Sequence, residues 1–435
     1  VKAAVLGKDK RYAPDRTFDT LHVRLELTVE PAKRTLEGTC VTTVKALKDG
    51  VRRLDFDSGG MTVLSASAAG KRLRHVRKGE RLEVFLPKTL PAGADADVSI
   101  RYKVGDPKRG FHFTGPSKET PDAPRQAWSQ GQPEDAHYWF PCHDSPHEKA
   151  TTEIVARVPK GFVAVSNGAL LSRKPAGAWE TFHWRLDHPH SLYLVTLTVG
   201  RFAEVREKWE DVPVVYYCEK GREADARRGF SQTKAALEVF SRKFGVRYPY
   251  ESYTQVAVSE FPGGMENTTA TTQTDACLLT KEAALDTALD TLIAHELAHQ
   301  WFGDLLPCRD WSHAWLNEGF ATYSEYVFLE EVKGKDEADR DFEVARRSYV
   351  DEDAQRYRRP IVCNTYTHPW ALFDRHLYEK GGWVLHMLRH ELGDGPFWKS
   401  IAHYLRRHRD QSVETTDLVA AIEAATGRNL RKYFD

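Results

Sequence analysis

Two histidines, His295 and His299, are spaced so that both imidazoles can bind one metal ion. Residues four positions apart on a helix lie one turn apart on the same face. Apolar residues at helical spacing over 283–293 predict such a helix, which Gly303 is expected to cap at its C-terminus. The pair therefore predicts a zinc site. The alternative is an ordinary helix face that carries two histidines, but Glu296 between them adds a carboxylate next to the predicted metal.

A third protein ligand for this metal is predicted at Glu318, which follows His299 after the 18 intervening residues 300–317. Gly303 and Pro307 interrupt the first helix, and a second apolar pattern begins near Trp315. This length allows a second helix to return beside the first. Two histidines and one glutamate, with the fourth position open to water, are typical of catalytic zinc and not of structural zinc.

Two further glutamates have predicted roles around the metal. Glu296 lies between the two histidines, where its carboxylate can take a proton from a zinc-activated water and pass it to the departing amine. This arrangement predicts peptide hydrolysis without a covalent intermediate. Glu325 lies seven positions after Glu318, about two helical turns along the same face. It either orients one of the ligand imidazoles or is an exposed surface residue.

The elements that must position these residues fall into two parts. Short runs with alternating apolar residues, separated by Gly, Pro and Asp, predict antiparallel strands over about the first 200 residues. The six clearest runs lie at 21–27, 40–44, 82–86, 98–102, 154–158 and 192–197. Helical spacing begins over Ala224 to Phe244 and, after a strand-like run at 253–258, continues to the end. We predict an N-terminal β-sheet domain over 1–205 and an α+β catalytic domain over 206–435.

The composition excludes several classes of protein. The 435 residues include 62 Lys and Arg and 62 Asp and Glu, so the formal net charge is zero, which argues against a nucleic-acid-binding protein. No uninterrupted apolar segment is long enough to predict a membrane span, and no signal-peptide pattern opens the chain. The cysteines are scattered without a Cys-x-x-Cys pair, and we expect reduced, mostly buried thiols in a cytoplasmic protein. They are Cys40, Cys142, Cys218, Cys277, Cys308 and Cys363.

Other features that could suggest binding are interpreted as helix faces in solvent. The charged stretches at 333–347 and 406–410 fit this description better than a binding patch. His386 and His390 share the four-residue spacing of the zinc pair, but Met387 follows the first of them where a glutamate would be needed. We interpret that pair as structural or solvated.

Four separate motifs, in the same order, resemble those of the gluzincin zinc aminopeptidases, the family of aminopeptidase N and the leukotriene epoxide hydrolase. The motifs are His-Glu-Leu-Ala-His with its continuation at 299–304, Trp-Leu-Asn-Glu-Gly-Phe-Ala at 315–321, Gly-Gly-Met-Glu-Asn at 263–267 and Tyr-Glu-Lys-Gly at 378–381. The resemblance runs over nearly the whole chain and includes Gln132 and the segment 138–141. It implies a β domain followed by a thermolysin-like domain, one catalytic zinc ion, and peptide substrates with a free N-terminus.

The resemblance also implies roles that spacing alone does not assign. The glutamate of the family's Gly-x-Met-Glu-Asn motif binds the α-ammonium of the substrate, which corresponds to Glu266, assisted by Gln132. The substrate-binding segment is Gly263, Gly264, Met265, Glu266 and Asn267. A carboxylate that pairs with one ammonium at a fixed distance from the scissile bond restricts cleavage to single N-terminal residues. The family's tyrosine, here Tyr378, donates a hydrogen bond to the tetrahedral oxyanion.

Two departures from the family pattern leave alternatives open. Most members carry a second glutamate where this chain has Gln132, which can accept a hydrogen bond from the ammonium but adds no charge. The leukotriene epoxide hydrolase also has glutamine there, so a bifunctional aminopeptidase and epoxide hydrolase is an alternative. The family usually continues into a C-terminal helical domain, which we expect to be absent here. A non-catalytic scaffold is a third reading, opposed by the retention of the ligands with Glu296 and Tyr378.

Overall fold

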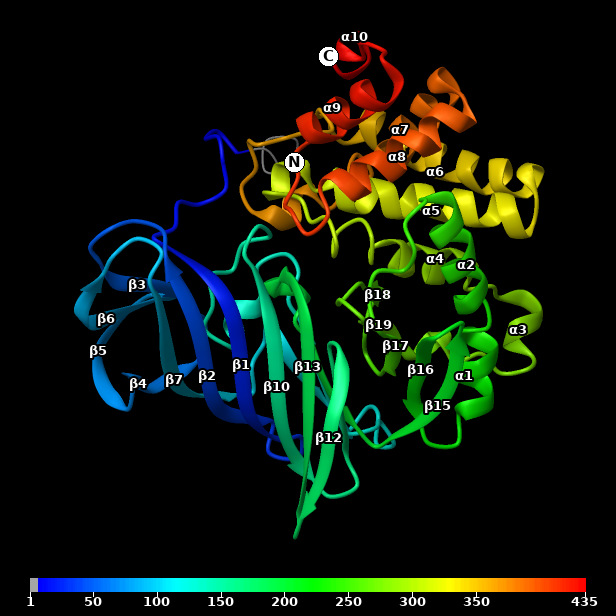
Figure 1. The fold of residues 1–435 in the computed structure, drawn as a ribbon. Helices are drawn as coiled ribbons and strands as arrows, with labels where there is room; N and C mark the ends of the chain where they lie inside the picture. Colours follow the sequence, from blue (N-terminus) through cyan, green and yellow to red (C-terminus); the bar gives the residue numbers. More distant parts are fainter. Residues whose placement is uncertain (1–6) are drawn as a thin grey trace. The chain divides into compact units, whose positions relative to one another are not determined.

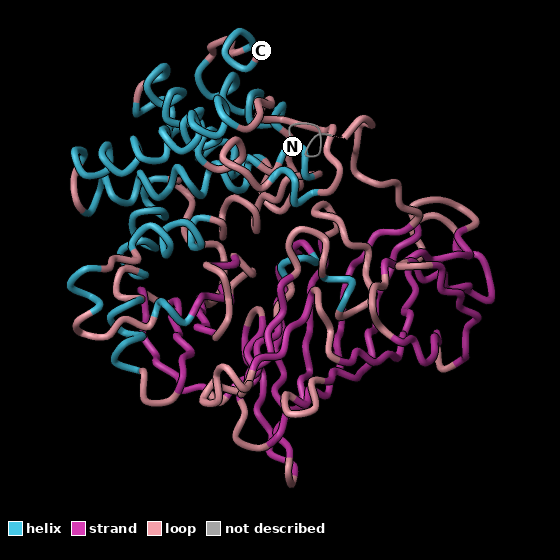
Figure 2. Tube along the Cα trace, turned by 180° about the vertical axis from the view of Figure 1, so that it is seen from behind, coloured by secondary structure: helices cyan, strands magenta, loops and turns pink. Residues whose placement is uncertain are grey.

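The computed structural model describes residues 7–435, which form two compact units. One unit consists of residues 14–228 and 250–280 and contains the β-sheets. The other consists of residues 7–13, 229–249 and 281–435 and is built mainly of helices. Figure 2 shows the helices in cyan and the strands in magenta. The two units are referred to below as the sheet unit and the helical unit.

A ten-stranded sheet is the largest layer of the sheet unit (Figure 1). Its strand order is β12-β13-β10-β1-β2-β7-β4-β5-β6-β3. Neighbouring strands are antiparallel except β1 and β10, which pair in parallel, a direction that alternating residues alone cannot reveal. The strands are β1 (Phe18–Glu30), β2 (Thr35–Ala46), β3 (Val51–Asp57), β4 (Thr62–Ala68), β5 (Lys71–Lys78), β6 (Arg81–Leu90), β7 (Asp95–Gly105), β10 (Lys149–Pro159), β12 (Ala169–Ala176) and β13 (Trp179–Ser191).

Two smaller sheets complete the sheet unit. A four-stranded antiparallel sheet has the order β11-β14-β9-β8, and a mixed five-stranded sheet has the order β15-β16-β17-β19-β18. The strands are β8 (Gly110–Thr114), β9 (Gln126–Gln130), β11 (Val163–Ser166), β14 (Leu197–Gly200), β15 (Phe202–Trp209), β16 (Val212–Glu219), β17 (Tyr253–Val258), β18 (Gly264–Met265) and β19 (Ala270–Thr274). The predicted strand at 253–258 is therefore present as β17.

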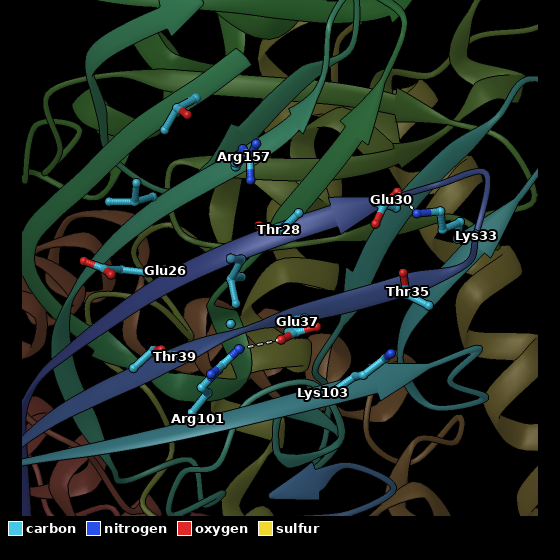
Figure 3. A pocket seen from close by; sticks show the side chains of 14 residues that line it. Glu26, Thr28, Glu30, Lys33, Thr35, Glu37, Thr39, Arg101, Lys103 and Arg157 are labelled. Carbon is cyan, nitrogen blue, oxygen red and sulfur yellow. Dashed lines mark hydrogen bonds and ion pairs between the residues drawn. The ribbon is translucent and has the colours of Figure 1, made fainter. Parts of the chain in front are cut away.

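Buried and more exposed side chains alternate along β1 and β2, so the large sheet has one buried face and one polar face. Leu25 is fully buried and pairs in register with Cys40, whereas Glu26 is exposed. The polar face is hollowed by a cavity of about 710 Å³ (Figure 3). Glu37 and Arg101 form an ion pair of 3.1 Å within this cavity. Its lining includes none of the residues predicted for catalysis.

Two predicted elements differ from those observed. The run 192–197 consists of a 3-10 turn (Leu192–Leu194), two loop residues and the first residue of β14, and its six side chains are all buried. The run lacks the polar positions of a half-buried strand because protein surrounds it on every side. The helical stretch predicted over Ala224 to Phe244 is split into α1 (Glu223–Gly229) and α2 (Thr233–Lys243).

Helices dominate the helical unit. They are α2, α3 (Ala283–Asp286), α4 (Asp290–Ala298), α5 (Trp315–Val332), α6 (Lys335–Gln355), α7 (Glu379–Leu392), α8 (Asp394–Arg407), α9 (Thr415–Thr426) and α10 (Arg431–Phe434). The charged stretch 333–347 lies mostly on α6, where i,i+3 ion pairs such as Arg346–Glu343 at 2.6 Å confirm a solvated helix face. Among the described residues, none of the helices combines the length and the apolar character needed to cross a bilayer.

Replacement of the buried Leu25 tests the alternation along β1. We expect Leu25→Ala to lower the free energy of unfolding by about 2–5 kcal/mol, since it removes buried methyl groups and leaves a cavity. Glu26→Ala on the exposed face is the matched control and should cost less than about 1 kcal/mol. Urea titration followed by tryptophan fluorescence measures both. Equal effects of the two substitutions would contradict the assignment of the faces.

Candidate active site

Helices α4 and α5 bring three metal-binding side chains together in the helical unit. His295 lies in α4, His299 is the residue directly after it, and Glu318 lies in the first turn of α5. The Nε2 atoms of His295 and His299 lie 3.4 and 3.2 Å from Oε2 of Glu318. One donor atom from each of the three residues lies within 4.8 Å of the others. His299 and Glu318 are buried, and His295 is largely so.

This arrangement fits a zinc ion. Zinc takes nitrogen and oxygen ligands in a tetrahedron at about 2.0–2.2 Å, so two of its ligand atoms lie roughly 3.3–3.5 Å apart. The two measured distances from Glu318 to His295 and His299 are close to that separation. Two imidazoles and one carboxylate also form the donor set of a catalytic zinc site, which keeps one position open.

The second nitrogen of each imidazole has its own partner. Nδ1 of His295 lies 2.7 Å from Oε1 of Glu325, and Nδ1 of His299 lies 3.0 Å from the carbonyl oxygen of Phe302. Such partners set the tautomer and leave Nε2 free to bind a metal. Glu325 is thus placed against a ligand imidazole and not turned to solvent. The Phe302 carbonyl could not be found from the sequence, because a backbone group has no residue-type signal.

The helix that carries the histidines is shorter than predicted. α3 and α4 are separate, because Thr287 adopts an extended conformation between them. Leu285, one of the apolar residues on which the longer helix was predicted, is 84% exposed. It therefore contributes no buried face to a continuous helix.

Gly303 does not cap α4 as predicted. The helix ends at Ala298, and the residue at its C-cap is His299. Gly303 instead has a φ of 128° and donates its N–H to the carbonyl of Leu306 at 3.0 Å. A Cβ at this position would lie 3.2 Å from Nδ1 of His299. Glycine therefore permits a tight turn beside the imidazole.

A pair of glycines lets α5 and α7 approach closely. A Cβ added to Gly319 would lie 2.9 Å from Cα of Gly381, and a Cβ added to Gly381 would lie 2.8 Å from Cα of Gly319. Gly319 directly follows Glu318. Tyr378 directly precedes α7, with its ring centroid 6.0 Å from that of His295. This close helix contact brings the predicted oxyanion donor and a predicted metal ligand into one site.

Burial and nearby positive charge shift the pKa values of the carboxyl groups in the site in opposite directions. Burial raises the pKa of Glu296 to about 6, although the positive charges of His295 and His299 oppose the increase. Burial also raises the pKa of Glu318, but the charges and hydrogen bonds of the same two histidines outweigh it and lower the value to about 2. When both imidazoles are protonated, their positive charges thus hold Glu318 in its ionised form.

The remaining predicted residues lie together in the sheet unit. Nε2 of Gln132 donates a hydrogen bond of 2.8 Å to Oε1 of Glu266, and both side chains are buried. Gly263 has a φ of 100°, and Gly264 and Met265 form β18 against β19. Asn267 donates to the carbonyl of Leu194 at 3.3 Å, which anchors the segment. The structure therefore gathers the predicted site residues into two groups, one in each unit.

Comparison with known sequences identifies the family. Residues 228–435 match the Peptidase family M1 domain, and residues 19–194 match the Peptidase M1 N-terminal domain. The chain belongs to the M1 peptidase family. Together the two matched regions cover most of the chain. They confirm the resemblance to the zinc aminopeptidases and the predicted fold class, a β-sheet domain followed by an α+β catalytic domain.

Several M1 relatives are similar over most of this chain. Aminopeptidase M1 of Arabidopsis thaliana is 32% identical over 85% of this chain and 43% of its own length. Aminopeptidase N of Streptomyces lividans is 28% identical over 96% of this chain and 49% of its own length. An M1 zinc metallopeptidase mutant from Deinococcus radiodurans, bound to a Tyr-Ser-Ala substrate, has a TM-score of 0.77 at 25% identity and covers 99% of this chain and 95% of its own. The chain thus spans less than half the length of these two curated aminopeptidases.

Substitution of Gly381 tests the close contact between α5 and α7. We expect Gly381→Ala to destabilise the protein by about 1–3 kcal/mol, because the added methyl group pushes the two helices apart. Gly395→Ala in α8 is the matched control, since a Cβ there meets nothing within 4 Å. It should leave stability unchanged or raise it by up to about 1 kcal/mol. Thermal unfolding measures both variants, and a Gly381→Ala variant as stable as the control would contradict the contact.

Proposed function

We propose that this chain is a zinc-dependent aminopeptidase that hydrolyses the N-terminal peptide bond of peptides. The observation that carries the proposal is the approach of His295 and His299 to Glu318, with the buried Glu296 beside them. Membership of the M1 family and the aminopeptidase relatives support it. The tripeptide bound by the Deinococcus radiodurans relative supports short peptides as substrates.

Three side chains would hold the metal, and two further groups would fix the ligand imidazoles. His295, His299 and Glu318 are the proposed ligands. Glu325 and the Phe302 carbonyl would orient the imidazoles through Nδ1. A zinc ion held by these residues would polarise the scissile carbonyl and would lower the pKa of a bound water to about 7.

Glu296 is the proposed proton carrier. It lies between the two metal ligands in sequence and is 5% exposed, so its carboxylate is shielded from bulk water. We assign it the role of general base, which takes the proton of the attacking water on a carboxylate oxygen. It then delivers this proton to the nitrogen of the departing peptide as general acid.

Specificity for the N-terminal residue is assigned to Glu266 and Gln132. The carboxylate of Glu266 would pair with the free α-ammonium, and the hydrogen bond from Gln132 holds that carboxylate in place. The segment 263–267 would lie along the substrate, where glycine at 263 and 264 permits close approach of the backbone. Tyr378 would donate its phenolic hydrogen to the developing oxyanion.

We also propose a cytoplasmic location. All six cysteines are buried, and none of them forms a disulfide in the described part of the chain. Buried cysteines outside disulfides are typical of proteins from reducing compartments.

Replacement of Glu296 tests whether this residue acts in the chemical step and not in metal binding. We expect Glu296→Gln to lower kcat by at least about 100-fold, the typical contribution of a general base, while the protein keeps one zinc ion at this site. The exposed Glu282→Gln serves as control and should be as active as the unchanged protein. Aminoacyl-naphthylamide hydrolysis and metal analysis give the two readouts. A Glu296→Gln variant whose kcat is not lowered would contradict the role of Glu296 as general base.

Replacement of the proposed ammonium partner tests the specificity. Glu266→Gln should lower kcat/KM for free-amine substrates by about 10–100-fold, because it removes one charge-assisted hydrogen bond. Glu260→Gln, on an exposed residue of the same region, should have no effect. Steady-state kinetics on dipeptides distinguishes the two variants. A Glu266→Gln enzyme with undiminished kcat/KM would contradict the assignment.

A further inference from the structure

A second cluster of metal-binding side chains lies in the sheet unit, in the turn that precedes β10. His143, His147 and Glu148 each offer one donor atom, and the three atoms lie within 4.8 Å of one another. The turn is closed by backbone hydrogen bonds from Ser145 N–H to the His143 carbonyl and from Glu148 N–H to the Ser145 carbonyl. The two histidines therefore converge although the intervening residues are not helical.

The two rings are arranged much as in the catalytic site. Their centroids are 5.7 Å apart with an interplanar angle of 72°. For His295 and His299 the corresponding values are 4.9 Å and 71°. His147 is half-buried, and its Nδ1 lies 2.8 Å from Oγ of Ser145, a contact within the same turn that orients its ring.

The imidazole of His143 contains a buried nitrogen without a partner. The residue is 5% exposed, and its Nε2 has no hydrogen-bond partner among the described residues. Its Nδ1 lies 3.8 Å from Oδ2 of Asp57. A buried polar atom without a partner destabilises the fold, and a bound ligand would remove this cost. At this distance Asp57 makes no hydrogen bond to the ring, but its negative charge lies on the side opposite Nε2 and favours a cation near the imidazole.

Glu148 is fully buried and is already held in position. Its Oε1 accepts the backbone N–H of Thr20 in β1 at 2.7 Å, and its Oε2 pairs with Arg16. Each carboxylate oxygen has two lone pairs, so both contacts leave capacity for a metal. Arg16 also pairs with Asp19 at 2.8 Å, so its positive charge is shared between two carboxylates.

The charges around the cluster favour a cation. Arg16 contributes one positive charge, whereas Asp19, Asp57 and Glu148 each contribute a negative one. A divalent ion would balance this excess at a place where burial strengthens electrostatic attraction. Two imidazole nitrogens and one carboxylate oxygen match the ligand preference of zinc.

We propose that His143, His147 and Glu148 form a second zinc site, which links the turn before β10 to β1 through Glu148 and Thr20. The site lies wholly within the sheet unit and shares no residue with the proposed catalytic centre. Its metal would stabilise this part of the fold and take no part in peptide hydrolysis. The proposal is therefore independent of the proposed function.

Metal content of the whole chain tests this site. Each protein is loaded with excess zinc, dialysed against metal-free buffer and analysed by inductively coupled plasma mass spectrometry. We expect two zinc ions per unchanged chain, one in His147→Ala, one in the double variant His295→Ala and His299→Ala, and none in the triple variant. His147→Ala is preferred over replacement of the buried His143 because a half-buried side chain is less needed for folding.

Two controls make the result specific. His390→Ala removes an exposed histidine that has His386 four positions before it on α7, and it should keep both ions. Peptidase turnover of His147→Ala should equal that of the unchanged protein, and zinc should raise the melting temperature of the double variant but not of the triple variant. A double variant without zinc, or loss of the second ion in His390→Ala but not in His147→Ala, would overturn the proposal.

Discussion

The approach of two imidazole nitrogens to one carboxylate oxygen, from successive helices, is the constraint on which the proposed function depends. The two imidazole nitrogens lie 3.4 and 3.2 Å from Oε2 of Glu318. This arrangement is favourable only when a proton or a metal ion lies among the three atoms. The packing of α4 against α5 must therefore hold an arrangement that the donor groups alone would not adopt. The turn after α4 adds to that packing, because Phe302 stacks on Phe320 of α5 with ring centroids 4.1 Å apart.

Small residues supply the space that this site requires. Gly319 and Gly381 let the backbones of α5 and α7 meet, so no side chain lies between the two helices at this point. Glu318 in α5 and Tyr378 directly before α7 are therefore brought close together. Gly303 permits the turn in which the Phe302 carbonyl reaches His299. Gly319 and Gly303 each directly follow a residue with a proposed role, and Gly381 lies three positions after Tyr378. The chemistry and the backbone geometry are therefore encoded in the same short segments of sequence.

The sequence was most informative where side-chain type and helical spacing act together. His295 and His299 could be paired because a helix places positions four apart on one face, and Glu318 because a helix break and a new apolar pattern separate it from them. The alternation of β1 likewise predicted its buried face. In contrast, the sequence contains no sign that β1 pairs in parallel with β10, because apolar and polar residues alternate in the same way in parallel and antiparallel strands. The end of α4 at Ala298 was also missed, because the turn after it is set by backbone hydrogen bonds, such as the one from Gln300 N–H to the Leu297 carbonyl, and not by local apolar spacing.

The central claim is that a metal in the His295, His299 and Glu318 site drives hydrolysis next to a free amine. The most direct measurement is the rate on aminoacyl-naphthylamides and on their N-acetylated counterparts, with and without a zinc chelator. The account predicts cleavage of the free-amine substrates alone, lost with the chelator and restored by zinc. No cleavage of either set by the zinc-loaded chain, or equal cleavage of both sets, would contradict it.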